Sequence, residues 1–259
     1  MDSHRNSERG PRGAGPGVIT PDGCAVELYA LLPAMGEPEI VHAAVPPGAS
    51  ILELGAGAGR MTRPLVELGH PVVAVDESRA MLDRLRGAAG TPVAEGSAGP
   101  APVGVETVEA RIQGLDLGRR FDAVLLASFL VNQPDDDLRC GFLRACRDHV
   151  RDDGCVIVQR HPPAWFDEAA EGERTSDGIT YRLRDLRRPG PDLLAATVEY
   201  QVEEQVWAQW FTTRRLDDRA FAAALAEAGL AVDAYLTADG SWARAVPRSR
   251  GRAFGRSPR

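Results

Sequence analysis

Lysine is absent from the sequence, because all 30 basic residues are arginines. Short-chain dehydrogenases use a catalytic Tyr/Lys pair, so this class of enzyme is excluded. No run of about 18 apolar residues occurs, which excludes a membrane-spanning helix. The arginine-only usage, with abundant Ala, Gly and Pro, indicates codon bias in a GC-rich bacterial genome.

Cysteines are few and scattered. The four of them (Cys24, Cys140, Cys146 and Cys155) form no CxxC pair, and none has a histidine at ligand spacing. We therefore expect reduced, mostly buried thiols and no metal site.

Charge and the two ends of the chain set expectations about partners. The net charge of −7 disfavours a nucleic-acid partner. The N-terminal segment has no apolar core of a secretion signal, so the cytoplasm is the expected location, with no membrane partner. Residues 1–17 and the basic segment 248–259 are predicted to be disordered tails. The sequence leaves open whether the protein forms a homodimer.

Hydrophobic periodicity predicts an α/β domain. Short apolar strands alternate with amphipathic helices, which favours a doubly wound, mostly parallel sheet. The expected strands are 51–54, 72–75, 105–112, 121–128 and 155–160, and the expected helices are two within 24–44, then 59–68, 78–86 and 135–150. A loop is expected over 87–103. After residue 160, an antiparallel hairpin is predicted (179–186 and 193–211), followed by a helix (217–228) and two strands (231–236 and 242–246).

A glycine-rich turn, ELGAGAGR at 53–60, follows the first of these strands and opens a helix. Its spacing is GxGxG, because Arg60 stands where the dinucleotide pattern GxGxxG needs a glycine. Glu53 would repel a pyrophosphate and attract a cation. Asp76, at the end of the next strand, can accept hydrogen bonds from both hydroxyls of a ribose; on Asp76 alone, a nicotinamide cofactor would fit equally well.

Four segments together resemble the class I S-adenosylmethionine-dependent methyltransferases of the small-molecule type. They are ELGAGAGR (53–60), VDESRAML (75–82), RFDAVLLASFL (120–130) and HVRDDGCVIVQ (149–159). The resemblance implies a methyltransferase domain over 18–247 with a seven-stranded sheet. It also implies N-terminal helices (18–45) over the cofactor and an antiparallel flap (177–212) over the acceptor site.

The same resemblance implies S-adenosylmethionine as cofactor and a set of residues around it. These are Tyr29, Glu53, Gly55, Gly57, Gly59, Arg60, Asp76, Glu77, Met81, Arg111, Ile112, Ala127 and Ser128. The chain departs from the family at 110–113, where many relatives carry an acidic residue that contacts the adenine amino group. Arg111 cannot accept that hydrogen bond, so either Gln113 or a backbone carbonyl takes this role, or the contact is absent.

Acceptor chemistry is predicted to lie at the carboxyl ends of the strands. His161, directly after the strand expected at 155–160, is the candidate general base because its titration range suits proton removal. Asn132, Arg160, Trp165 and Trp207 are candidate substrate contacts. The segment His161-Pro-Pro-Ala-Trp165 is similar to the Asn/Asp-Pro-Pro-aromatic motif of nucleic-acid amino methyltransferases, but it follows the fifth strand instead of the fourth, so we reject that interpretation.

The sequence thus predicts methyl transfer to a small-molecule acceptor through oxygen, nitrogen or carbon, in specialised metabolism. Two alternatives stay open: a non-catalytic regulator or partner subunit that binds S-adenosylmethionine, and a nicotinamide-dependent oxidoreductase.

Overall fold

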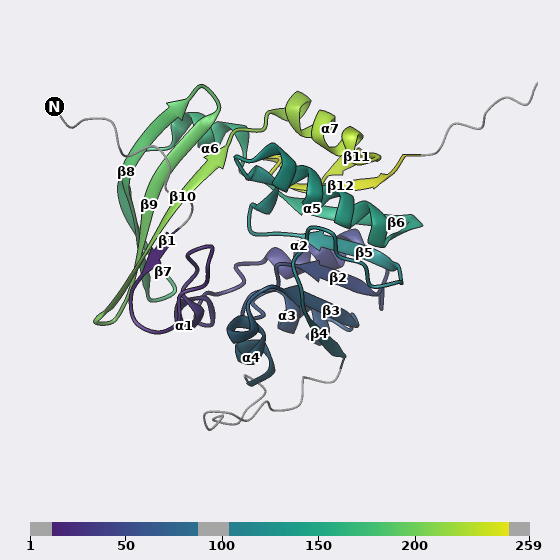
Figure 1. Cartoon of the computed structure of the whole chain (residues 1–259), viewed down its shortest axis with the longest axis horizontal. Coiled ribbons are helices and arrows are strands. Elements are labelled where there is room, and N and C mark those ends of the chain that lie inside the picture. The colour runs from purple at the N-terminus through teal and green to yellow at the C-terminus, as the bar shows by residue number, and fades with distance from the viewer. Residues whose placement is uncertain (1–11, 88–103, 249–259) are drawn as a thin grey trace, which may run out of the picture.

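Two β-sheets make up most of the molecule, with helices around one of them (Figure 1). The computed structural model describes residues 12–87 and 104–248. The predicted loop over 87–103, apart from its first residue, lies outside these ranges, as do residues 1–11 and 249–259 of the predicted tails.

The larger sheet has seven strands in the order β11-β12-β6-β5-β2-β3-β4. Six of its strands run in one direction, and β12 runs in the opposite direction, antiparallel to both β6 and β11. The prediction of a doubly wound, mostly parallel sheet is therefore confirmed. The strands are β2 (Ile51–Leu54), β3 (Val72–Asp76), β4 (Val105–Glu109), β5 (Phe121–Leu126), β6 (Val150–Gln159), β11 (Leu230–Tyr235) and β12 (Trp242–Pro247).

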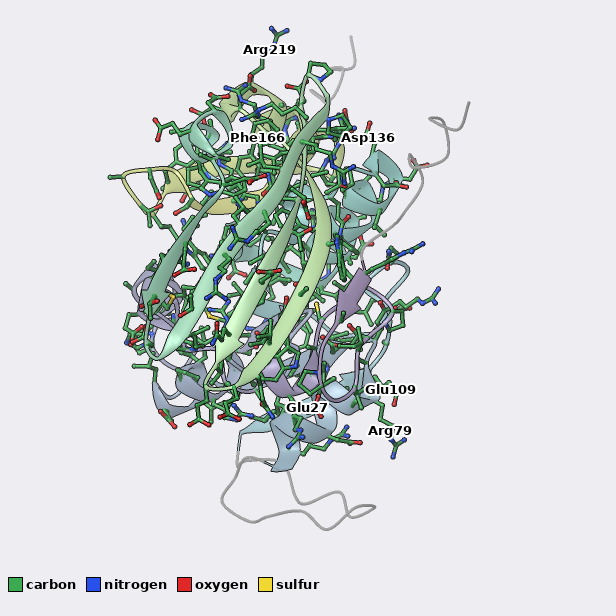
Figure 2. All side chains as sticks on the ribbon, turned by 90° about the vertical axis from the view of Figure 1, so that its left-hand side faces the viewer. Glu27, Arg79, Glu109, Asp136, Phe166 and Arg219 are labelled. Carbon is green, nitrogen blue, oxygen red and sulfur yellow. The ribbon has the colours of Figure 1, made fainter. Side chains whose placement is uncertain are left out.

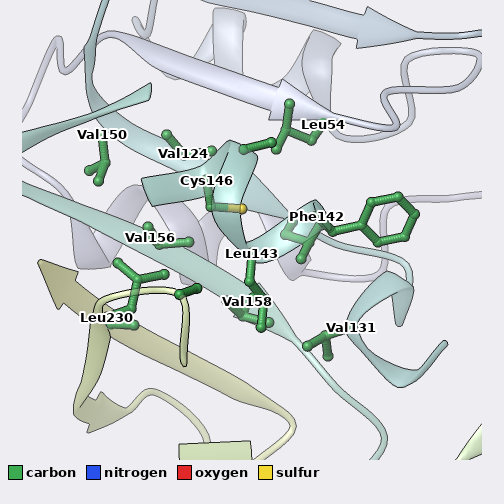
Figure 3. Close-up of a cluster of buried hydrophobic side chains, with 14 of the residues drawn as sticks. Leu54, Val124, Val131, Phe142, Leu143, Cys146, Val150, Val156, Val158 and Leu230 are labelled. Atoms are coloured by element: carbon green, nitrogen blue, oxygen red, sulfur yellow. The ribbon is translucent and has the colours of Figure 1, made fainter. Parts of the chain in front are cut away.

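Helices cover both faces of this sheet because its parallel strands carry apolar side chains on both sides. On one face, α5 (Asp136–His149) and α7 (Asp218–Glu227) pack against the strands. Figure 3 shows Leu143 and Cys146 of α5 among Val124, Val156 and Val158 of the sheet. The opposite face is covered by α2 (Glu37–Ala44) and α3 (Thr62–Glu67), while α1 (Val26–Tyr29) packs against α4 (Arg79–Gly87).

The chain reverses its direction of winding between β2 and β5. From β2 it proceeds outward through β3 and β4, and then returns to form β5 and β6 on the other side of β2. Open α/β sheets bind ligands at the carboxyl ends of the strands beside such a switch point. The glycine turn after β2 lies there.

The second sheet, called the flap below, is antiparallel and has the strand order β1-β10-β9-β8-β7. Its long strands cross in front of the rest of the molecule in Figure 2. The short helix α6 (Pro163–Glu168) docks on it through the buried Phe166. The flap strands are β1 (Arg12–Ala14), β7 (Gly172–Ser176), β8 (Ile179–Gly190), β9 (Leu193–Val202) and β10 (Gln205–Arg214).

Two expectations about the flap are wrong. Residues 12–14 were assigned to a disordered tail, yet they form β1 and pair with β10. The single strand expected over 193–211 is two strands, β9 and β10, joined at Glu203 and Glu204. Glu203 has a positive φ of 53°, and no glycine or proline marks the turn, so the sequence carries no ordinary turn signal there.

Some element boundaries also differ from the prediction. Helix α3 begins at Thr62, three residues after the expected start at residue 59, because the glycine turn continues through that segment. Strand β6 begins at Val150, five residues before the expected start. Within the described residues, no helix is long and apolar enough to cross a membrane.

Candidate functional site

A cavity of about 780 Å³ lies between the carboxyl ends of β2, β3, β5 and β6 and the inner face of the flap. Its volume is within the range of pockets that hold small molecules. The glycine turn and Asp76 line one half, which we call the cofactor half. The flap and the segments after β5 and β6 line the other, which we call the acceptor half.

The three glycines of the turn (Gly55, Gly57 and Gly59) differ in what surrounds them. All three have positive φ angles, which glycine adopts without steric cost. A Cβ at Gly59 would lie 2.8 Å from Cγ of Leu85, so this glycine lets α4 approach the turn. A Cβ at Gly57 would meet nothing within 4 Å, and Gly57 lines the cavity. The turn is therefore tight on the protein side and open on the cavity side.

Asp76 fixes the turn from the end of β3. Its carboxylate accepts hydrogen bonds from the backbone N–H of Gly57 (2.8 Å) and from that of Ser78 (2.8 Å). Burial raises the pKa of Asp76, against these two hydrogen bonds. Each oxygen keeps lone-pair capacity after accepting one bond, so the carboxylate can also accept hydrogen bonds from the cavity that it lines.

Glu53 is the most deeply buried carboxyl group of the cavity, at 3% exposure. It accepts a hydrogen bond of 2.6 Å from the hydroxyl of Thr62. Burial, with a smaller contribution from Asp76, raises the pKa of Glu53 to about 8. Glu53 and Asp76 together give the cofactor half an acidic wall.

Arg60 and Tyr29 close the cofactor half toward the flap. Arg60 forms an ion pair with Glu37, the first residue of α2. The Tyr29 hydroxyl donates a hydrogen bond of 3.0 Å to Gln209 on β10, and burial raises the pKa of Tyr29. The N-terminal helices thus link the cofactor half to the flap.

Three stacked rings dominate the acceptor half. The His161 ring lies between Phe129, with centroids 4.0 Å apart, and Trp165, with centroids 4.1 Å apart, and both stacks are nearly parallel. Because both faces of the imidazole are covered, only its edge can meet a ligand. Burial lowers the pKa of His161 to about 3, so the ring is neutral at physiological pH. The sequence did not indicate Phe129, which precedes the short 3₁₀ helix at Leu130–Asn132.

The flap side of the acceptor half was predicted only in outline. Residues at alternate positions of its strands face the cavity: Tyr181 and Leu183 on β8, Val198 and Tyr200 on β9, and Gln209 and Phe211 on β10. A period of two is the sequence signal for such a face. This signal does not assign the inner face, because the sequence has no turn signal at Glu203–Glu204 and the register of the strands is therefore undefined. The N-terminal residues Thr20, Asp22 and Cys24 also line the cavity without having been predicted.

The structure brings most of the predicted cofactor residues together in the cavity wall: Tyr29, Glu53, Gly55, Gly57, Arg60, Asp76, Met81 and Ser128. It does not bring Gly59, Glu77, Arg111, Ile112 or Ala127 into that wall. Arg111 is exposed and pairs with Glu77 at 3.3 Å, and Ile112 belongs to the hydrophobic core. For these five residues, contact with the cofactor stays a prediction.

Two predicted substrate contacts are wrong. Arg160 is 1% exposed; its guanidinium donates to the backbone carbonyls of Gly240 and Leu216 and pairs with Asp218. Trp207 is also 1% exposed, and its indole N–H donates to the carbonyl of Pro16. Arg160 points away from the side that His161 lines. Trp207 shares its face of β10 with Gln209, but the N-terminal segment covers it through Pro16, Ala25 and Leu28.

Trp165, Asn132 and His161 do line the cavity. The Asn132 amide is already engaged, since its oxygen accepts from the His161 backbone N–H (2.9 Å) and its nitrogen donates to the Arg214 carbonyl. A direct role for Asn132 in holding a substrate, and the role of His161 as a base, stay predictions.

Comparison with known proteins agrees with this geometry. A family model described as a methyltransferase domain matches residues 51–154. A curated relative, the cypemycin N-terminal methyltransferase of a Streptomyces species, is 30% identical over 138 residues, which are 52% of this chain and 50% of that protein. The chain therefore matches about half the length of this relative.

Solved structures extend the similarity over most of the chain. An S-adenosylmethionine-dependent methyltransferase from Clostridium acetobutylicum superposes with a TM-score of 0.64 at 14% identity, covering 85% of this chain and 94% of that one. The sugar N-methyltransferase KedS8 from Streptoalloteichus superposes with a TM-score of 0.63 at 22% identity, covering 96% and 99%. At such identities these similarities show a shared fold. Residues 51–154 thus match a methyltransferase domain, and most of the chain has the fold of S-adenosylmethionine-dependent methyltransferases.

Proposed function

We propose that this protein transfers the methyl group of S-adenosylmethionine to an amine nitrogen of a small molecule. The observation that carries the proposal is one continuous cavity, whose acidic, glycine-lined half and ring-lined half open into one another. Such a cavity can bring a methyl donor and an acceptor into line, and positioning is the main requirement of this displacement.

The cofactor half has the chemistry that S-adenosylmethionine requires. Asp76 can accept hydrogen bonds from the ribose hydroxyls, the open side of Gly57 admits a close approach, and Glu53 can pair with the ammonium group. S-adenosylmethionine supplies a methyl group bound to a sulfonium. The relative from Clostridium acetobutylicum is named as dependent on S-adenosylmethionine, which supports this assignment.

The state of His161 favours nitrogen over oxygen as the methylated atom. A hydroxyl group must lose its proton as it is methylated, and a base whose pKa is about 3 removes such a proton poorly. A neutral amine already offers a lone pair, and amino groups with pKa values of about 8 are partly neutral at physiological pH. The neutral His161 edge can accept a hydrogen bond from the amine N–H and so orient its lone pair.

The carboxylate that lines the acceptor half is engaged in an ion pair. Glu173, on β7, pairs with Arg182, and Arg174 and the flap tyrosines are not bases at neutral pH. The relatives with named substrates, cypemycin N-terminal methyltransferase and the sugar N-methyltransferase KedS8, act on nitrogen. This supports an amine acceptor of specialised metabolism.

A paired substrate panel tests the proposal. Amino sugars, aminopentoses and peptides with a free N-terminus would be incubated with S-adenosylmethionine beside hydroxy analogues of the same skeleton. Formation of S-adenosylhomocysteine and the mass gain of one CH₂ would be measured, with Asp76→Ala as the inactive control. We expect turnover with amines only. Turnover restricted to hydroxy compounds would overturn the choice of nitrogen, and binding of S-adenosylmethionine without turnover on any acceptor would favour the non-catalytic alternative.

A further inference from the structure

A backbone corner after β5 holds the first ring of the acceptor half. Ser128 and Phe129 are consecutive residues with φ angles of 54° and 58°. This left-handed conformation is unfavourable for residues that carry a Cβ. Such a conformation persists where surrounding contacts fix it, and it is found preferentially at functional sites.

The corner is closed by a backbone bond, in which the Leu130 N–H donates to the Ala127 carbonyl (3.2 Å), and it is held further by Gln159, the last residue of β6. Its side-chain oxygen accepts a hydrogen bond of 2.7 Å from the Ser128 backbone N–H. Gln159 is 4% exposed, so water does not readily replace this partner. Loss of the acceptor would remove this side-chain restraint and leave the corner with the backbone bond between Leu130 and Ala127.

Gln159 is itself held from the other side of the site. Its amide nitrogen donates a hydrogen bond of 2.6 Å to Glu37 at the start of α2. Glu37 pairs in turn with Arg60, which follows the glycine turn and lines the cofactor half. A continuous polar chain therefore runs from Arg60 through Glu37 and Gln159 to the Ser128 N–H.

The far end of this chain is the ring stack. Phe129 lies on His161, which lies on Trp165. The stack's other support is Asn132, which accepts from the His161 backbone N–H. The Gln159 side chain forms its hydrogen bonds with the Ser128 backbone and with Glu37, so its effect on the rings passes through the corner.

We propose that Gln159, held by Glu37, is a positioning residue that keeps the Ser128–Phe129 corner left-handed and thereby builds the ring stack that orients the acceptor. Glu37 acts by fixing the Gln159 amide so that its oxygen faces Ser128. The reference to an acceptor rests on the function proposed above. The link between Gln159 and the stack does not, and it can be measured in the protein alone.

Substitutions at Gln159 separate the two hydrogen bonds. Gln159→Met removes both of them at nearly the same side-chain length. Gln159→Glu keeps an oxygen for the Ser128 N–H but sets a carboxylate against Glu37. The double variant Glu37→Gln with Gln159→Glu reverses the donor and acceptor and restores the bond between these positions. Gln201→Met, on β9 of the flap, is the matched control for loss of an amide.

The readout is the NMR spectrum of histidine labelled with ¹³C in its ring, with the His161 signals assigned from the loss of signals in His161→Gln. Two stacked neighbours shift these ring protons upfield. We expect Gln159→Met to move them toward the position of an exposed histidine, Gln159→Glu to move them part of the way, and the double variant to return them. The control should leave them in place. Thermal unfolding of each variant identifies any that is not folded.

Retained upfield signals in folded Gln159→Met would overturn the proposal, as would a double variant that shifts as far as Gln159→Glu alone. Binding of S-adenosylhomocysteine, followed by calorimetry, is the separate measure of the proposed function. Normal ring shifts without binding would count against that function only, and binding with unaltered shifts in Gln159→Met would count against the positioning role only.

Discussion

Replacing Glu53 with glutamine should make the free protein more stable at alkaline pH and weaken its binding of the cofactor. In the folded protein, burial raises the pKa of Glu53 from its ordinary value of 4.5 to about 8. Between these two values the folded state keeps a proton that the unfolded state has released. Folding therefore takes up a proton in this range, and stability falls as the pH rises.

The size of this change in stability follows from the pKa shift of Glu53. Each pH unit inside the window removes about 1.4 kcal/mol from the free energy of unfolding. By pH 8 the single carboxyl group has lowered that free energy by about 4 kcal/mol relative to pH 4, which is a large part of the stability of an ordinary domain. Glutamine has the same shape, can still accept the Thr62 hydrogen bond and does not ionise. Glu53→Gln should therefore match the wild type at pH 4 and exceed it at pH 8.

The affinity for the cofactor should rise with pH, whereas the stability of the free protein falls. A bound ammonium group favours the ionised carboxylate, so binding releases up to one proton per site below pH 8. The affinity of the wild type for S-adenosylhomocysteine should then rise by up to about tenfold per pH unit between pH 6 and 8, and Glu53→Gln should lose this dependence.

Chemical denaturation at pH 4, 6 and 8 gives the stabilities, and calorimetry in two buffers with different ionisation heats gives the proton release. Glu106→Gln, at an exposed carboxylate paired with Arg119, is the control and should change stability by less than about 1 kcal/mol at every pH. The reasoning is refuted if Glu53→Gln is no more stable than the wild type at pH 8, or if the wild type binds without releasing protons.

Three further substitutions test the remaining assignments. Asp76→Ala should reduce the affinity for S-adenosylhomocysteine at least about 30-fold, equivalent to about 2 kcal/mol for two lost hydrogen bonds to a charged group; an unchanged calorimetric affinity would contradict the placement of the ribose. Arg160→Ala should lower the free energy of unfolding by about 3–5 kcal/mol, because it leaves a buried set of acceptors without donors, yet it should spare ligand affinity. Arg120→Ala, at an exposed ion pair, is the control. Equal stability of the two variants would argue against a structural role of Arg160. Leu143→Ala, at a fully buried site of α5, should cost about 2–5 kcal/mol in denaturant unfolding, and a loss below 1 kcal/mol would contradict the packing in Figure 3.

The parallel sheet could be predicted because its signals are local. Strands β2, β3 and β5 and the second half of β6 are short apolar runs, and turns or helices with a polar face follow them in the sequence. The glycine turn with Glu53 before it and Asp76 after it could be predicted for the same reason. These positions lie at the ends of consecutive strands, so the order of the elements already places them at one edge of the sheet.

Parts of the flap could not be predicted from local sequence signals. Its hairpin from β9 to β10 turns at two glutamates, and β1 comes from a segment whose composition is typical of a disordered tail. Strand β1 is held by pairing with the distant β10, and the turn at the two glutamates is held by the pairing of β9 with β10, so strand pairing overrides weak local preferences. The inward face of the flap, and with it Tyr181 and Tyr200, could not be assigned without the register.

The sequence by itself determined the class of fold, the glycine turn and the acidic wall of the cofactor half, because each depends on residues close together in the chain. The tertiary structure alone decided that Arg160 is buried against Asp218 while its neighbour His161 enters the cavity. It also decided that Phe129, His161 and Trp165 form one stack, and that Gln159 reaches Ser128. Adjacent side chains on a strand take opposite directions, and only the packing of the whole chain fixes which direction leads to the site.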